Sequence, residues 1–164
     1  MARKVFFSFH YERDNWRVQQ IKNMGAVEGQ AILQANEWES VKRGGDQAIK
    51  NWIDGQMKDR SCCVVLIGSE TAGREYVEYE ILSAWNSGKG VLGIYIHNLL
   101  NASGQISRQG ANPFSRFTTN QGTVSLDTLV PVYDPAGRDS AAVYRTISDN
   151  IEGWVEDAIT RRRR

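Results

Sequence analysis

Hydrophobic residues along this chain fall into short continuous runs separated by stretches with a helical spacing. Runs of consecutive apolar residues predict β-strands at 5–9, 62–67, 91–96 and 129–133. A weaker strand is predicted at 31–35. Because these runs show little polar alternation, they are typical of strands that are buried on both faces, as in a parallel sheet.

The stretches between the runs carry apolar residues at the period of amphipathic helices. We expect one helix to begin at Asp14 and another at Asp46, because aspartate readily caps a helix N-terminus. A third apolar stripe runs from Val77 to Trp85 and stops before Gly88, a frequent helix terminator. The last helix carries its apolar residues between 147 and 159.

Strands that alternate with helices predict a single α/β domain spanning residues 1–160. Five strands with helices on both faces indicate a flavodoxin-like, doubly wound parallel sheet, with the strand that contains Pro131 at an edge. In such sheets, ligands bind beyond the carboxyl ends of the strands. The places to inspect for a site are therefore residues 9–11, 37–38, 68–69 and 97–98.

Composition and charge narrow the classes of partner. The net charge of +1 gives no reason to expect a nucleic acid or a membrane, and no apolar run approaches the about 18 residues that span a bilayer. Without a signal-peptide pattern, the chain is expected to be cytoplasmic. Cys62 and Cys63 are adjacent in a strand and are expected to be reduced core thiols. Residues 161–164 are all arginine and are expected to form a frayed basic tail.

One long polar segment, 97–127, is rich in Gly, Asn and Ser and exceeds a routine connection. Two readings stay open for it, a flap or partner loop at the site and a plain insertion.

Motifs of several enzyme classes are missing. The chain has no dinucleotide-binding glycine fingerprint, no phosphate-binding P-loop, no serine-nucleophile elbow and no metal motif. What remains is segment 68–81, in which a buried strand leads into a polar loop and a carboxylate-rich helix. Glu78 and Glu80 border opposite sides of the apolar stripe, so helical geometry alone does not choose between them as the functional carboxylate. Glu75 and Glu78 also lie where the helix dipole favours acidic residues.

Several blocks of sequence resemble TIR domains, in particular the TIR-like subunit of the bacterial Thoeris anti-phage system. The blocks read RKVFFSFHYERD from Arg3, CCVVLIGSETAGREYVEYEI from Cys62, GVLGIYIHN from Gly90 and GANPF from Gly110. Together they cover roughly Arg3 to Phe114. The resemblance implies the flavodoxin-like TIR fold that the element order also indicates.

The resemblance also implies a catalytic residue. TIR enzymes place an aromatic residue four positions before the catalytic glutamate and an aliphatic residue just after it, which Tyr76, Glu80 and Ile81 match. The usual Trp-Cys pair is Tyr76-Val77 here. By this resemblance, Glu80 would stabilise the oxocarbenium-like transition state as NAD+ loses nicotinamide. NAD+ would be the substrate, with no further cofactor and no metal.

The outcome of that reaction depends on the attacking group. Attack by water gives ADP-ribose, and attack by an adenine nitrogen gives a cyclic ADP-ribose. Resemblance to Thoeris proteins favours a cyclised product that activates a separate effector protein in defence against phage. It also leaves room for a phage-derived trigger and for a homo-oligomeric active form.

Six further residues are candidates for binding the substrate, and four of them have a plainer alternative. Trp38 would stack on a cationic ring or lie in the core, and Asp46 would bind ribose hydroxyls or cap its helix. His10 would bond a ribose or phosphate oxygen or be capped in its loop, and Arg74 would neutralise the pyrophosphate or remain an exposed loop arginine. Ser8, between core aromatics, would face the ligand. Tyr76 is the aromatic residue of the glutamate motif.

Two other functions compete with the enzyme. Many TIR domains are non-catalytic adaptors that associate with one another, and this chain fits that reading as well. A phosphoacceptor receiver would also use this fold, but it needs an aspartate cluster at the strand ends, where this chain has Phe9-His10-Tyr11 and Gly68-Ser69.

Overall fold

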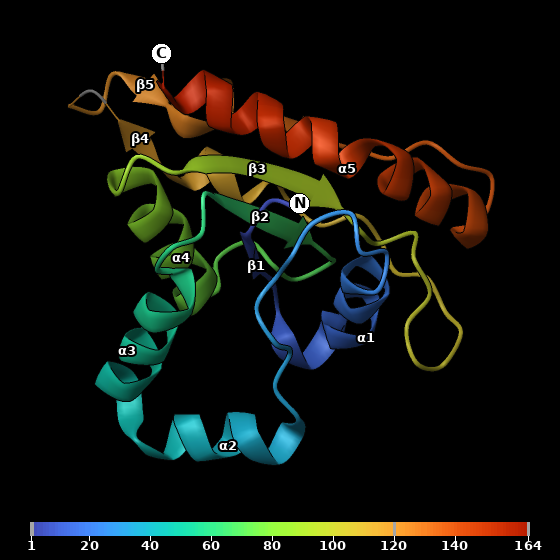
Figure 1. Ribbon diagram of the computed structural model, residues 1–164, viewed down its shortest axis with the longest axis horizontal. Helices are drawn as coiled ribbons and strands as arrows, with labels where there is room; N and C mark the ends of the chain where they lie inside the picture. Colours follow the sequence, from blue (N-terminus) through green and yellow to red (C-terminus); the bar gives the residue numbers. More distant parts are fainter. Residues whose placement is uncertain (1, 120, 164) are drawn as a thin grey trace.

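A four-stranded parallel sheet forms the centre of the computed structural model, which describes residues 2–119 and 121–163 (Figure 1). The strand order is β1-β2-β3-β6, and every neighbouring pair is parallel. The bounds are β1 Val5–Ser8, β2 Cys62–Ile67, β3 Gly90–Tyr95 and β6 Val132–Tyr133. A separate antiparallel hairpin pairs β4 (Thr118–Thr119) with β5 (Val124–Ser125).

Helices cover both faces of the sheet, as predicted. They are α1 Tyr11–Lys22, α2 Ala35–Arg43, α3 Gly45–Met57, α4 Glu75–Asn86 and α5 Ser140–Arg163, with short 3-10 turns η1 Pro113–Arg116 and η2 Leu126–Thr128. Alternate residues of β2 point to opposite faces. Val64 and Leu66 pack with α1 and α5, whereas Val65 and Ile67 pack with α3 and α4. The α/β class and its doubly wound layering are therefore confirmed.

The predicted count of five strands is wrong, because residues 31–34 form no strand and α2 begins at Ala35. The edge of β1 is instead closed by a bridge from Lys4 to Glu28 and by the side chain of Gln30. The Gln30 Oε1 accepts from the Phe7 amide at 2.9 Å, and its Nε2 donates to the Phe7 carbonyl at 2.8 Å. A side-chain amide thus satisfies the backbone groups that an additional strand would otherwise pair.

Both predicted aspartate caps are also wrong. Helix α1 begins at Tyr11, so Asp14 lies inside it, where it is 1% exposed and pairs with Arg17 at 2.9 Å. Helix α3 begins at Gly45, and Asp46 in its first turn makes no capping bond. Each carboxylate has another partner, since Asp14 accepts from the Arg17 guanidinium and Asp46 accepts from the Tyr76 hydroxyl.

The prediction for the two cysteines is confirmed, and the prediction for the arginine-rich end is not. Cys62 and Cys63 are free, buried thiols as predicted, and burial raises the pKa of Cys62 to about 12. Residues 161–163 continue α5, so the frayed tail is wrong for them, and Arg164 lies outside the described residues. The guanidinium of Arg162 lies 4.0 Å from the Trp85 ring centroid and donates to the Trp85 carbonyl, which holds this turn in place. Within the described ranges, no helix has an apolar stretch long enough to cross a bilayer.

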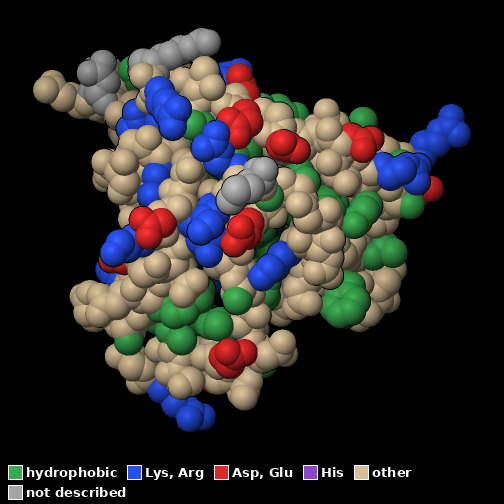
Figure 2. Space-filling model, viewed as in Figure 1, with side chains coloured by type: hydrophobic (Ala, Val, Ile, Leu, Met, Phe, Trp, Pro, Cys, Tyr) green, Lys and Arg blue, Asp and Glu red, His purple; other side chains and the backbone are tan. Residues whose placement is uncertain are grey.

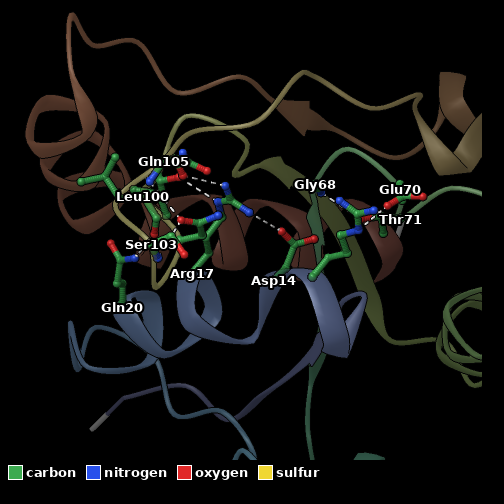
Figure 3. Close-up of polar contacts among 12 residues, drawn as sticks. Asp14, Arg17, Gln20, Gly68, Glu70, Thr71, Leu100, Ser103 and Gln105 are labelled. Carbon is green, nitrogen blue, oxygen red and sulfur yellow. Dashed lines mark hydrogen bonds and ion pairs between the residues drawn. The ribbon is translucent and has the colours of Figure 1, made fainter.

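The long segment 97–127 begins by packing against α1 through buried polar contacts (Figure 3). Arg17 donates to the carbonyls of Leu99 at 2.7 Å and Gln105 at 3.1 Å, and Gln20 donates to the carbonyl of Leu100. The bond to Leu99 is buried and satisfies a carbonyl that would otherwise lack a partner, whereas the bond to Leu100 is exposed. The segment is anchored to the body of the domain.

Candidate active site

A cavity of about 320 Å³ lies beside β1, where β1 ends and α1 begins. Helices α2 and α3 form one wall, the first half of α4 forms another, and residues 30–33 lie along β1. In Figure 2, hydrophobic side chains gather in the region between α2 and α3, while basic and acidic side chains are interspersed over the same face of the molecule. The cavity is therefore mainly apolar, with a few polar groups, as is usual for small-molecule sites.

Glu80 of α4 lies at the inner side of this cavity and is 8% exposed. The Ser8 hydroxyl, at the end of β1, donates to Glu80 Oε1 at 2.6 Å. Burial raises the pKa of Glu80 to about 8, and the hydrogen bond from Ser8 opposes that shift. The cavity therefore contains a buried carboxyl group whose neutral form is favoured by its surroundings.

The two glutamates that helical geometry could not separate have different surroundings. Glu78 points out of the cavity, where its Oε2 pairs with Arg116 Nε of η1 at 2.6 Å. Of this pair, Glu80 alone lines the cavity. The reason is tertiary: β1 and its Ser8 pack against one border of the helix, and η1 packs against the other.

Four of the six predicted binding residues line the cavity together with Glu80, and two do not. The four are His10, Trp38, Arg74 and Tyr76. Ser8 is fully buried beneath Glu80, so it faces the carboxyl group and not open space. Asp46 is displaced from the cavity and accepts a hydrogen bond from the Tyr76 hydroxyl at 2.9 Å.

Trp38 belongs to an aromatic row that the sequence did not reveal. The structure places Trp38 on α2 and not after a strand. Its ring centroid lies 5.6 Å from that of Tyr11 and 6.1 Å from that of Trp52, and Phe9 continues the row at 6.3 Å from Tyr11. The rule that ligands bind beyond the carboxyl ends of the strands predicted Tyr11 as a site residue. No signal in the sequence predicted that Trp52 of α3 lies at the same wall.

The strand ends at 68–69 and 97–98 do not contribute to this cavity, contrary to the expectation from the fold rule. None of the described residues of segment 97–127 lines it either, so a flap or partner loop at the site stays a prediction. Gly110 instead packs behind the β2–α4 loop, where a Cβ would lie 2.2 Å from the Gly68 carbonyl oxygen. The segment supports the loop that leads to α4.

Charged groups at the cavity are few and mostly paired. Arg74 donates to the Glu70 carbonyl, and Lys42 lies 5.9 Å from the centroid of Trp38 while contacting Glu39 at 3.1 Å. The pKa of His10 is lowered, chiefly by burial and then by Arg74. The cavity therefore presents one buried carboxyl group (Glu80), the exposed carboxylates of Glu12 and Glu75, flat aromatic surfaces and the cations of Lys42 and Arg74.

The fold and the cavity define a flavodoxin-like α/β domain with a pocket that contains one buried glutamate. Residues 6–101 match the family described as "Thoeris protein ThsB, TIR-like domain". A relative from Bacillus cereus (strain MSX-D12), named "Putative cyclic ADP-D-ribose synthase ThsB1", is 36% identical over 119 residues. The matched region covers 70% of this chain and 62% of the length of that relative. The chain belongs to the Thoeris ThsB TIR-like family.

Proposed function

We propose that this protein cleaves the nicotinamide–ribose bond of NAD+, with Glu80 as the catalytic residue. The observation that carries the proposal is the buried Glu80 carboxyl group, which lines a cavity of about 320 Å³ and is held by Ser8. Membership of the ThsB family and the name of the Bacillus cereus relative support the same reaction.

The reaction suits a single carboxylate. When the glycosidic bond breaks, its electron pair goes to the nicotinamide nitrogen, which turns from cationic to neutral, and positive charge moves to the ribose. Glu80 as a carboxylate stabilises that charge. Bringing the cationic nicotinamide riboside beside Glu80 favours ionisation of a group whose pKa burial raises to about 8. Binding of the substrate therefore favours the negatively charged form of Glu80 that the reaction needs.

The other cavity residues bind the rest of the substrate and exclude water. Trp38 and Tyr11 offer flat faces for a ring of the dinucleotide, and Arg74 with His10 faces its pyrophosphate. Apolar side chains such as Phe6 and Ile32 limit water around the ribose. Exclusion of water favours attack by the adenine nitrogen, which forms a new bond to the anomeric carbon and yields a cyclic ADP-ribose.

A cyclic product points to signalling. We propose that this product activates a separate effector protein after a phage-derived trigger, and that assembly of several copies controls the reaction. NAD+ is the substrate, and the proposed reaction needs no other cofactor.

The decisive experiment measures nicotinamide release and nucleotide products by mass spectrometry, in purified protein and in cells with and without phage. Glu80→Gln is expected to lower nicotinamide release by about a hundredfold or more, because the transition state loses its counter-charge. Glu78→Gln is the matched control, since this residue lies on the same helix but outside the cavity. Circular dichroism verifies that both variants fold.

Two results would overturn the proposal. Loss of turnover in Glu78→Gln with normal turnover in Glu80→Gln would show that Glu80 is not the catalytic residue. A complete lack of NAD+ turnover in every assembly state, in infected cells as well, would favour the non-catalytic adaptor, whose partner binding Glu80→Gln leaves intact.

A further inference from the structure

The wall of the cavity that α2 provides is anchored by partly buried side chains, Trp38 and Val41, which pack against the core. None of the residues of α2 is buried, although Trp38 and Lys42 of this helix line the cavity. Helix α2 joins α3 at Gly44, and the following Gly45 has a φ of +85°, a conformation that glycine adopts without strain. The corner between the two helices is a point where their relative position can vary.

One polar contact ties this corner to the helix that carries Glu80. Asp46 follows the corner directly, and its Oδ1 accepts from the Tyr76 hydroxyl of α4 at 2.9 Å. Lys50, one turn further along α3, holds the other carboxylate oxygen at 3.2 Å. Tyr76 lines the cavity one turn before Glu80, so the contact spans the two walls of the site. A hydrogen bond to a charged acceptor is stronger than one between neutral groups.

We infer that Asp46 is a positioning residue that clasps the α2–α3 corner against α4 through the Tyr76 hydroxyl and thereby sets the width of the substrate cavity. The inference rests on the proposed NAD+ cleavage at this cavity. It replaces the direct binding of ribose by Asp46 that the sequence predicted. It also explains what the Tyr76 hydroxyl does at a position where TIR enzymes usually have tryptophan.

The chain contains a matched control for this clasp. Tyr79 of α4 donates to both carboxylate oxygens of Asp54 on α3, at 2.8 and 3.0 Å. This second tyrosine–aspartate pair joins the same two helices, yet neither of its residues lines the cavity. A merely structural role predicts equal effects from the two pairs, and the clasp predicts that only one of them acts on the substrate.

The test compares KM and kcat for NAD+ in variants of both pairs. Asp46→Ala and Tyr76→Phe are expected to raise KM about three- to tenfold and to change kcat by less than about twofold, because Ser8 holds Glu80 independently. Their double variant is expected to equal either single variant. Asp46→Asn, whose amide oxygen still accepts a hydrogen bond, is expected to stay within about twofold of the wild type. Asp54→Ala and Tyr79→Phe are expected to leave KM unchanged.

Three results would overturn the clasp: additive effects of Asp46→Ala and Tyr76→Phe, an equal rise in KM from the Asp54 pair, or an Asp46→Asn variant as impaired as Asp46→Ala. Hydrogen exchange provides a readout that does not depend on NAD+. Faster exchange of residues 35–50 in Asp46→Ala, but not in Asp54→Ala, supports the clasp, and equal exchange in both variants contradicts it. If the wild type shows no NAD+ turnover in any assembly state or in infected cells, the proposed function fails and the exchange result alone decides the clasp.

Discussion

At the scale of single residues, the central feature is a glutamate whose surroundings oppose its charge. Glu80 is surrounded by apolar side chains, and its one hydrogen-bond donor among the described residues is the Ser8 hydroxyl. One neutral donor compensates only part of the cost of removing a carboxylate from water. The folded protein therefore favours protonated Glu80 more strongly than the unfolded chain does.

This difference predicts how stability depends on pH. The pKa of Glu80 rises from 4.5 to about 8 on folding, so its contribution is fully present below pH 4.5 and is lost as the pH rises through 8. Chemical denaturation of Glu80→Gln and wild type between pH 5 and pH 9, run at about one-unit steps, measures this loss. The variant is expected to gain stability relative to the wild type as the pH rises to 8, and the difference then levels off. A difference that does not change with pH would contradict the raised pKa.

At the scale of elements, the edge of β1 shows how one side chain replaces a strand. Gln30 is 3% exposed, and both ends of its amide bond to the backbone of Phe7. Gly29 lies against the ring of Phe7, where a Cβ would come within 2.3 Å of a ring carbon. Because no strand occupies this edge among the described residues, the space beside Phe6 and Phe7 is free to form the cavity.

We therefore expect Gln30→Ala to be strongly destabilising. The substitution leaves the amide and the carbonyl of Phe7 without partners in a buried place, which costs about 2–4 kcal/mol of unfolding free energy. Gln47→Ala is the control, because Gln47 is exposed on α3 and bonds only to the Asn51 side chain. Its expected effect is within about 0.5 kcal/mol. Equal effects in denaturant titrations would show that the Gln30 amide does not support β1.

At the scale of the whole molecule, a buried ion pair connects parts of the chain that are distant in sequence. Arg17 is 3% exposed, pairs with Asp14, and bonds to carbonyls of the segment that follows β3 (Figure 3). Burial raises the pKa of Asp14 even though Arg17 opposes that shift. The same helix begins with Tyr11 at the cavity, so one element contacts both the site and the loop behind it.

Removing the Arg17 guanidinium is expected to weaken the packing of the segment that follows β3. Arg17→Met leaves the Asp14 carboxyl group buried without its partner, which costs about 3–5 kcal/mol, and hydrogen exchange at the amide of Ser107 is expected to accelerate. Adding Asp14→Asn to Arg17→Met is expected to recover part of the loss. Gln20→Ala, which removes only an exposed bond to Leu100, is the mild control. An Arg17→Met protein as stable as Gln20→Ala would contradict this account.

The sequence alone was sufficient for features that depend on neighbours along the chain. Continuous apolar runs identified β2 with its bounds and β3 within one residue (predicted 91–96, observed Gly90–Tyr95), and helical periodicity identified the helix of Val77 and Ile81. Burial on a sheet imposes these periods directly. The blocks near Arg3 and Cys62 also revealed the family, which the match over residues 6–101 confirms.

Other features were decided only by contacts between distant segments. Glu80 lies in the cavity and Glu78 outside it because β1 and η1 pack on opposite borders of α4. Residues 31–34 are not a strand because an amide 23 residues from Phe7 takes the backbone bonds there. Asp46 reaches Tyr76 across 30 positions of sequence. A local pattern specifies which side of an element is polar, whereas the partner of each polar group is chosen when the elements pack.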